Sequence, residues 1–198
     1  MGRRERRATE TRIKLFHSAL ELIAERGLTN VTVEDITKAA DVGKGTFFNY
    51  FATKEHVLGV MAEIQLGKLD EAVVRVAQGN EPLYPVLRRL VQRLAEEPGR
   101  SPKLARALMS SFLGNESVRA ILKRKMVDGR KTIAEVVRIG QERGEIDPTL
   151  KEEKVAVQLL QMVMGTAFLW SLHEKPALSN WMEDSFQHAW RAIAAPGK

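Results

Sequence analysis

The chain has 198 residues, of which 44% are hydrophobic and 28% are charged, a composition that is ordinary for a folded protein and excludes a wholly disordered one. It has no cysteine, which excludes disulfides, thiol nucleophiles and zinc–thiolate sites, and its four histidines form no His-x-x-x-His pair. We therefore expect no metal, no cofactor and no hydrolytic metal centre. The formal net charge of +6 favours a polyanionic partner without identifying one.

The first 14 residues are basic, with six cationic side chains against Glu5 and Glu10. A basic segment that leads into a helix suits phosphate contact, although a solvated tail has the same composition. No apolar segment follows, so a secretory signal is not expected. The six basic residues among the first 14 positions are Arg3, Arg4, Arg6, Arg7, Arg12 and Lys14.

Residues 155–173 carry no charge but include Gln158, Gln161 and His173, which favour a helix buried by protein over a membrane span. We expect a cytoplasmic protein with no membrane partner.

Apolar residues recur at helical spacing along almost the whole chain, and no segment of strand length alternates with period two. The pattern predicts an all-α fold of about nine helices, the first beginning after a cap at Thr9 and ending before Gly27. The other helices are expected at about residues 33–40, 44–51, 54–78, 82–96, 103–113, 116–143, 149–173 and 178–194, the last two divided by Glu174-Lys175-Pro176.

Residues 32–51 combine two short helices and a tight turn. Thr32 and Asp35 have the spacing of a capping box, which fixes the start of the first short helix. In the second helix Phe47 and Phe51 lie four residues apart on one face, which we expect to be buried. The opposite face then presents Lys44, Gly45, Phe48 and Asn49. A cation, an amide and an aromatic edge suit base and phosphate contacts, so the layout is that of a DNA-binding helix-turn-helix.

The run TVEDITKAADVGKGTFFNYFATKE from Thr32 to Glu55 closely resembles the DNA-binding domain of the TetR (tetracycline repressor) family of transcriptional regulators. The similarity extends back through the preceding helix and covers about the first 56 residues. Two positions differ from the family's pattern: Phe48 stands where tyrosine is frequent, and Asp41 occupies a turn position that is often glycine. Asp tolerates the left-handed backbone, so we expect the turn to be kept.

The resemblance implies a homodimer that binds a roughly palindromic double-stranded DNA operator, with a DNA-binding domain over residues 1–54 and an effector-binding and dimerisation domain over residues 55–198. By the family's pattern Lys44, Thr46, Asn49 and Tyr50 face DNA, while Thr32 and Lys54 lie on phosphates. The complete predicted DNA-binding set is Thr32, Lys44, Gly45, Thr46, Phe48, Asn49, Tyr50 and Lys54.

The resemblance also implies a small-molecule effector, which we expect to be largely apolar, in a cavity among the middle helices. Its binding would shift the long helix that follows the DNA-binding domain. Methionine and phenylalanine at helical spacing more often fill a core, so that interpretation of the same residues stays open. The candidate ligand contacts are Met61, Ile64, Tyr84, Met109, Phe112, Met126, Met162, Thr166 and His173.

The last two helices favour a dimer interface, because all three tryptophans and two phenylalanines lie between residues 168 and 190. The alternative is a thick core of a monomer. We expect a two-fold four-helix arrangement whose members include Leu160, Met164, Phe168, Trp181, Phe186 and Trp190.

Two other classes of protein compete with a ligand-responsive repressor. An architectural DNA-binding protein without an effector predicts weak sequence preference and no cavity. An enzyme, such as a hydrolase built on Ser110 or Ser111, lacks a nucleophile elbow or paired acidic motif, so we do not expect catalysis.

Overall fold

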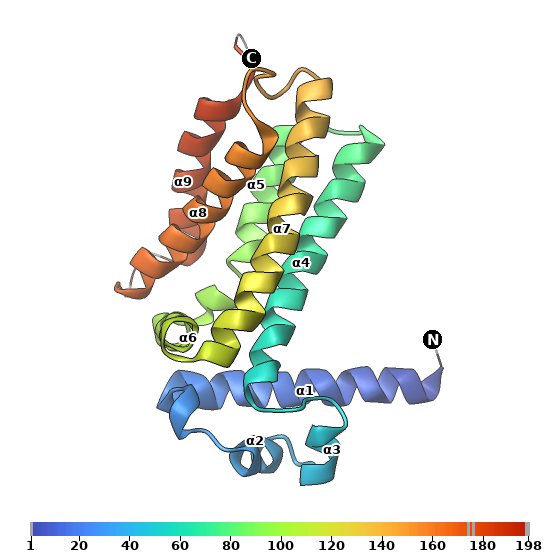
Figure 1. The fold of residues 1–198 in the computed structure, drawn as a ribbon, viewed down its shortest axis with the longest axis vertical. Helices are drawn as coiled ribbons and strands as arrows, with labels where there is room; N and C mark the ends of the chain where they lie inside the picture. The colour runs from blue at the N-terminus through green and yellow to red at the C-terminus, as the bar shows by residue number, and fades with distance from the viewer. Residues whose placement is uncertain (1, 174, 176, 197–198) are drawn as a thin grey trace. The chain divides into compact units, whose positions relative to one another are not determined.

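The computed structural model describes residues 2–173, 175 and 177–196, and the side chains of Arg3 and Arg4 also lie outside the described part. The all-α prediction is confirmed: the described residues form nine α-helices and two short 3-10 helices, with no strand among them (Figure 1). Glu174 and Pro176, which we expect in the last interhelical turn, lie outside the described residues. The elements are α1 Arg3–Arg26, η1 Leu28–Asn30, α2 Val33–Ala39, α3 Lys44–Phe48, α4 Glu55–Gln78, α5 Leu83–Leu94, η2 Pro98–Arg100, α6 Pro102–Gly114, α7 Glu116–Glu142, α8 Glu152–Ser171 and α9 Leu178–Ile193.

Helix α1 begins earlier than its sequence pattern predicts. The expected cap at Thr9 is wrong, because its hydroxyl donates to the Glu5 carbonyl within the helix. The helix starts instead after Gly2, whose N–H donates to the Glu5 carboxylate at 2.8 Å. Arg6 and Glu10 form an ion pair one turn later at 3.0 Å, a spacing that supports exposed helix. The basic N-terminal segment is therefore helical.

Helix α3 is shorter than expected and ends at Phe48 instead of Phe51. The N–H of Tyr50 bonds to the Phe47 carbonyl three residues back, so the chain tightens into a turn there. Phe47 and Phe51 nevertheless both point inward, with exposed fractions of 0% and 3%.

The chain divides into two compact units, each drawn from separate parts of the sequence. The first contains Met1–Ala62 and Lys103–Leu122, and the second contains Glu63–Pro102 and Lys123–Lys198. The functional boundary that we expect at residue 54 stays a prediction.

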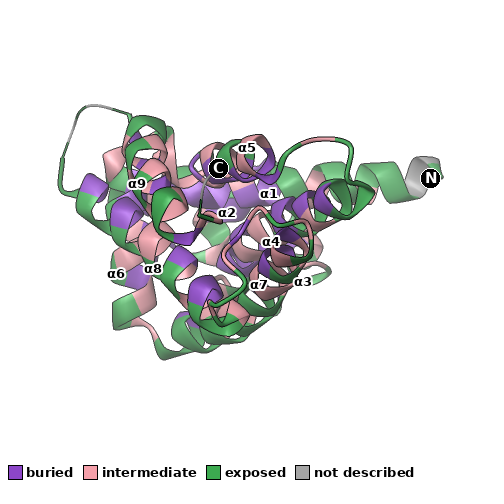
Figure 2. Ribbon diagram, turned by 90° about the horizontal axis from the view of Figure 1, so that it is seen from above, coloured by how far each residue is buried: buried purple, intermediate pink, exposed green. Residues whose placement is uncertain are grey.

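The core of the first unit is built on one stripe of α1. Leu15, Phe16, Leu20 and Ile23 recur at helical spacing and are almost fully buried. Buried side chains of this size each contribute about 1.5–3 kcal/mol of transfer free energy. Figure 2 shows the contrast between these buried turns and the exposed N-terminal end of α1.

The second unit packs α9 against α8 and α5. The ring of Tyr84 on α5 stacks on Phe186 at a centroid distance of 5.6 Å and meets the edge of Trp190 at 5.4 Å. Phe186 and Met182 are almost fully buried in this layer. An isolated antiparallel bridge between Ile146 and Ala194 joins the α7–α8 connection to the end of α9.

A buried ammonium group joins α4 to the end of α5 in the second unit. Lys68 is 6% exposed, and its Nζ lies 2.6 Å from the Glu97 carboxylate and 3.1 Å from that of Glu96. It also donates to the Arg93 carbonyl in the last turn of α5, where the helix dipole favours a cation. The charge of Lys68 is thus neutralised by groups on a neighbouring segment.

The uncharged stretch at residues 155–173 lies mostly within α8. No helix in the described part of the chain is long and apolar enough to cross a membrane.

Candidate nucleic-acid interface

The first helix of the helix-turn-helix begins at a complete capping box, as its sequence predicts. The Thr32 hydroxyl oxygen accepts the Asp35 N–H at 3.1 Å, and the Asp35 carboxylate accepts the Thr32 N–H at 2.9 Å. Arg26 of α1 lies 3.7 Å from the same carboxylate. The Thr32 hydroxyl also donates to Asp35 at 2.7 Å, so its contact with a phosphate stays a prediction.

This capping carboxylate predicts a specific dependence on pH. The Thr32 hydroxyl and N–H hold the pKa of Asp35 below its ordinary value of 3.8. A lowered pKa stabilises the folded state above the ordinary value, and the contribution is lost as pH falls through the folded-state pKa. We expect Asp35→Asn to melt at a lower temperature than wild type near neutral pH. That difference should shrink as pH falls below about 4, because the carboxylate of the unfolded state is protonated there first and that of the folded state only at lower pH. Thermal unfolding followed by circular dichroism measures it, and a difference independent of pH would contradict the assignment.

The turn between α2 and α3 requires an unusual backbone conformation at Asp41. Its φ is +51°, in the left-handed region, and its N–H bonds to the Lys38 carbonyl at 3.2 Å. The N–H of Val42 closes the turn on the Thr37 carbonyl at 3.0 Å. The expectation that aspartate keeps the turn is confirmed.

A β-branched residue at position 41 should destabilise this turn. We expect Asp41→Val to lower the free energy of unfolding by about 1–2 kcal/mol, because the left-handed conformation brings its Cβ close to the backbone. Asp41→Gly is the matched control and should change the stability little, since glycine adopts this conformation freely. Urea unfolding of both variants measures the difference, and equal stabilities would contradict strain at this position.

Helix α3 and the residue after it expose polar and aromatic side chains to solvent, and the buried ring of Phe47 lies beneath them. Lys44, Gly45, Phe48 and Asn49 are exposed, and Phe48 is 50% exposed although it is apolar. The Phe47 ring beneath meets Phe48 edge-on at 5.5 Å and thereby supports it. The predicted division of this helix into a buried and an exposed face is confirmed. Thr46 and Tyr50 are half-buried at its borders.

Sequence reasoning missed a partner of Lys44. The Lys44 ammonium forms an ion pair with Glu34 in the first turn of α2. The hydrogen bond from Lys44 is the main reason that the pKa of Glu34 is lowered. The two residues are ten positions apart on different helices, so no local pattern indicates the pair. A DNA phosphate or base that binds Lys44 would compete with this carboxylate for the ammonium group.

The ammonium group of Lys54 already has hydrogen-bond partners within the chain. Its Nζ donates to the carbonyl oxygens of Leu28 at 2.8 Å, Val31 at 2.7 Å and Thr29 at 3.3 Å. The side chain is half-buried. Its contact with phosphate stays a prediction.

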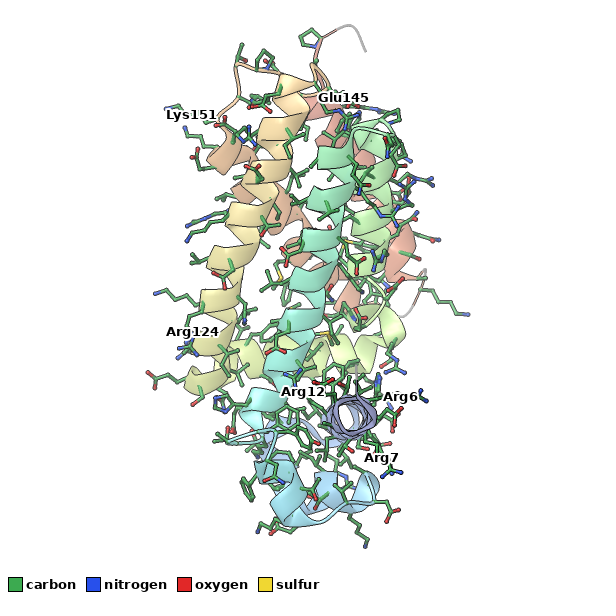
Figure 3. The ribbon with its side chains drawn as sticks, turned by 90° about the vertical axis from the view of Figure 1, so that its right-hand side faces the viewer. Arg6, Arg7, Arg12, Arg124, Glu145 and Lys151 are labelled. Carbon is green, nitrogen blue, oxygen red and sulfur yellow. The ribbon has the colours of Figure 1, made fainter. Side chains whose placement is uncertain are left out.

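The basic residues of α1 face different directions. Figure 3 shows Arg6 and Arg7 pointing outward on one side of the helix and Arg12 on the other. The Arg12 guanidinium lies 5.8 Å from the centroid of the Phe51 ring, a cation–π distance. Arg12 therefore packs on the helix-turn-helix, whereas Arg7 and Lys14 are exposed to solvent.

The candidate effector contacts fall in both units. Met61 is buried and Met109 and Phe112 are half-buried in the first unit, while the remaining six lie in the second. Each polar candidate already has a neighbour: Tyr84 packs on Phe186, and the Thr166 hydroxyl donates to Ser185 at 3.0 Å. His173 is exposed and lies 5.1 Å from the Trp181 ring. Ile64, Met126 and Met162 are half-buried.

A surface hollow in the second unit contains none of these candidates. It is lined by Gly79, Asn80, Glu81, Pro82, Arg143 and Glu145. The Arg143 guanidinium already donates to the Val76 and Glu81 carbonyls. An effector role for the nine predicted residues stays a prediction.

The predicted dimer residues divide by exposure. Phe168 is 43% exposed, and Leu160, Met164, Trp181 and Trp190 are half-buried. Phe186 is 1% exposed in the single chain and packs on Tyr84, so it offers almost no surface to a partner.

Two further exposed apolar residues, which the aromatic pattern does not indicate, lie close to Phe168 in the chain. Leu169 is 52% exposed and Leu172 is 59% exposed. Leu172 follows Phe168 by four residues and Leu169 by three, the spacings at which side chains meet on a helix surface.

The two serines considered as nucleophiles differ in their surroundings. Ser111 is buried and donates its hydroxyl to the Ala107 carbonyl at 2.7 Å, whereas Ser110 is exposed. Among the described residues no group of three histidine, aspartate or glutamate side chains is placed to hold a metal ion.

Comparison with known proteins agrees with this geometry. Residues 15–61 match the family model described as bacterial regulatory proteins, tetR family. The transcriptional regulator UidR of Escherichia coli is 25% identical over 167 residues, which span 83% of this chain and 84% of UidR. The fold is similar to that of FadR, a fatty acid degradation regulator from Bacillus halodurans, with a TM-score of 0.76, 21% identity and coverage of 91% and 94% of the two chains.

A second solved structure is more similar in sequence. FadR of Thermus thermophilus, a TetR-family transcriptional repressor crystallised with lauroyl-CoA, is 30% identical, with a TM-score of 0.64 and coverage of 90% of this chain and 92% of FadR. The helix-turn-helix, the all-α fold and this similarity over nearly the whole length lead to one assignment. The chain belongs to the TetR family of bacterial transcriptional regulators.

Proposed function

We propose that this regulator is a homodimeric repressor that acts in the cytoplasm on a roughly palindromic operator and is released by a small-molecule effector. The exposed face of α3 carries the proposal. Lys44, Phe48 and Asn49 stand in solvent above buried Phe47 and Phe51, an arrangement that suits the major groove. Asn49 can pair with adenine through two hydrogen bonds, and Lys44 can reach guanine or a phosphate.

We propose a largely apolar effector that binds in the second unit. Met126, Met162 and Ile64 would supply apolar contact, and Tyr84 or Thr166 would supply polar contact. The 30% identical FadR was crystallised with lauroyl-CoA, so fatty acyl-CoA thioesters are the first compounds to test. Binding would have to change operator affinity through a coupling free energy, typically about 1–3 kcal/mol.

The deciding experiment selects bound duplexes from a random-sequence DNA pool at fixed, near-physiological salt, followed by sequencing. Salt is held constant because phosphate contacts make the affinity strongly salt-dependent. We expect a palindromic consensus with half-sites about one helical turn apart. An unenriched pool from folded protein would instead indicate an architectural DNA-binding protein.

The selected operator then becomes the probe for effectors. We expect a compound of the correct class to lower operator affinity about 5- to 150-fold. A compound that binds the protein with no change in operator affinity would be a ligand but no inducer.

A further inference from the structure

We infer that Lys54 is a positioning residue that holds the start of α4 to the connection between α1 and α2, and that it does not contact DNA phosphate. The inference deepens the proposed function and rests on it, because it concerns how the helix-turn-helix is held for operator binding. The observation behind it is the convergence of three carbonyl oxygens on one ammonium group.

A lysine ammonium has three N–H donors and no acceptor. The carbonyl oxygens of Leu28, Thr29 and Val31 lie 2.7–3.3 Å from the Lys54 Nζ and match those three donors. The residues that supply them, 23 to 26 positions earlier, form the short helix η1 and its end. A phosphate could bind this ammonium only by displacing a carbonyl, which would then lose its donor.

Lys44 makes a useful contrast within the same helix-turn-helix. Its side chain is 56% exposed, and its partner Glu34 is a side chain at the surface that is 64% exposed. Such a pair is exchanged for a phosphate without loss of backbone hydrogen bonds. Two lysines that the family's pattern assigns to DNA therefore have different surroundings in this chain.

The segment that Lys54 holds also sets the position of α2. Val31 is fully buried, the Asn30 amide donates to the Arg26 carbonyl at 2.9 Å, and Thr32 caps α2. Helix α4 begins at Glu55, directly after Lys54. A displacement of the start of α4 is consequently passed to the start of α2, and then to α3 through the packing of α2 on α3.

The experiment compares Lys54→Met with Lys44→Met on the selected operator over a range of salt concentrations. Methionine keeps an unbranched side chain and removes the N–H donors. Each lost phosphate contact makes the plot of log affinity against log salt shallower by about one unit. We expect that change for Lys44→Met. For Lys54→Met we expect the wild-type slope and an affinity about tenfold weaker, within the range typical of coupling between sites.

A second measurement on the same variants tests positioning directly. Adding or removing one base pair between the half-sites should lower the operator affinity of wild type and of Lys44→Met strongly. The same change should lower the affinity of Lys54→Met by a smaller factor. A shallower salt slope for Lys54→Met, or unchanged spacing discrimination, would overturn the inference.

The unmodified protein supplies a test that does not depend on variant folding. The ammonium protons of Lys54 should be protected in NMR spectra of the free protein, and their signal should stay in place when operator is added. Coupling of that nitrogen to a DNA phosphorus would overturn the inference. If no operator is ever enriched, the proposed function fails, while the spectrum of the free protein still reports on the contacts of Lys54.

Discussion

Replacing Phe168 and Leu172 with aspartate is expected to convert the proposed homodimer into monomers and to weaken operator binding by roughly a hundredfold to ten-thousandfold. The side chains are four residues apart at the end of α8, and they are 43% and 59% exposed in the single chain. In a two-fold interface each new charge would be buried against apolar groups or a like charge. A monomer reaches only one half-site, so the gain from linking two binding modules is lost.

The matched control is Leu113→Asp, which places the same charge on an exposed apolar residue of α6. Leu113 is 74% exposed, and we expect this variant to remain a dimer. Size-exclusion chromatography with light scattering gives the mass, and circular dichroism shows whether the fold is kept. Phe186→Ala should act differently, because removing a buried aromatic ring costs about 3–5 kcal/mol of chain stability. A double aspartate variant that remains a dimer would refute the α8 interface.

Replacing Asn49 with alanine is expected to lower affinity for the selected operator by about 1–3 kcal/mol, roughly tenfold to more than a hundredfold. Binding to unrelated DNA should change little, because phosphate contacts are unaffected. Asn49 is exposed and terminates α3 through its backbone N–H, which alanine keeps. The stability of the variant should therefore stay close to that of wild type.

Asn80→Ala is the corresponding control, since this exposed asparagine lies in the α4–α5 connection. Fluorescence anisotropy with operator and scrambled duplexes at one salt concentration gives the ratio of specific to non-specific affinity. The same ratio for Asn49→Ala and Asn80→Ala in folded dimers would remove Asn49 from the recognition surface.

Local sequence patterns predict much of this fold because their causes are local. The Thr32–Asp35 capping box joins residues three apart, and the burial of Phe47 and Phe51 follows from their spacing of four. The start of α1 was missed because Thr9 resembles a cap. The helix starts instead after Gly2, whose N–H bonds to the Glu5 carboxylate, and the charged residues between Gly2 and Thr9 continue it.

The parts that sequence reasoning missed depend on contacts between distant residues. The Lys44–Glu34 pair and the carbonyl partners of Lys54 form only once the helices have packed. The aromatic residues of α8 and α9 likewise differ in burial, although the sequence pattern treats them alike. Phe186 is buried under Tyr84, whereas Phe168 faces solvent, and only tertiary packing separates them.

The buried Lys68 limits how α4 can respond to an effector. Removing one partner from a buried ion pair costs about 3–5 kcal/mol, whereas the coupling between two binding sites typically amounts to only about 1–3 kcal/mol. Separating Lys68 from Glu97 and the last carbonyls of α5 would therefore cost more than such a coupling free energy. We therefore expect the part of α4 around Lys68 to keep its contacts with the end of α5 when the proposed effector binds.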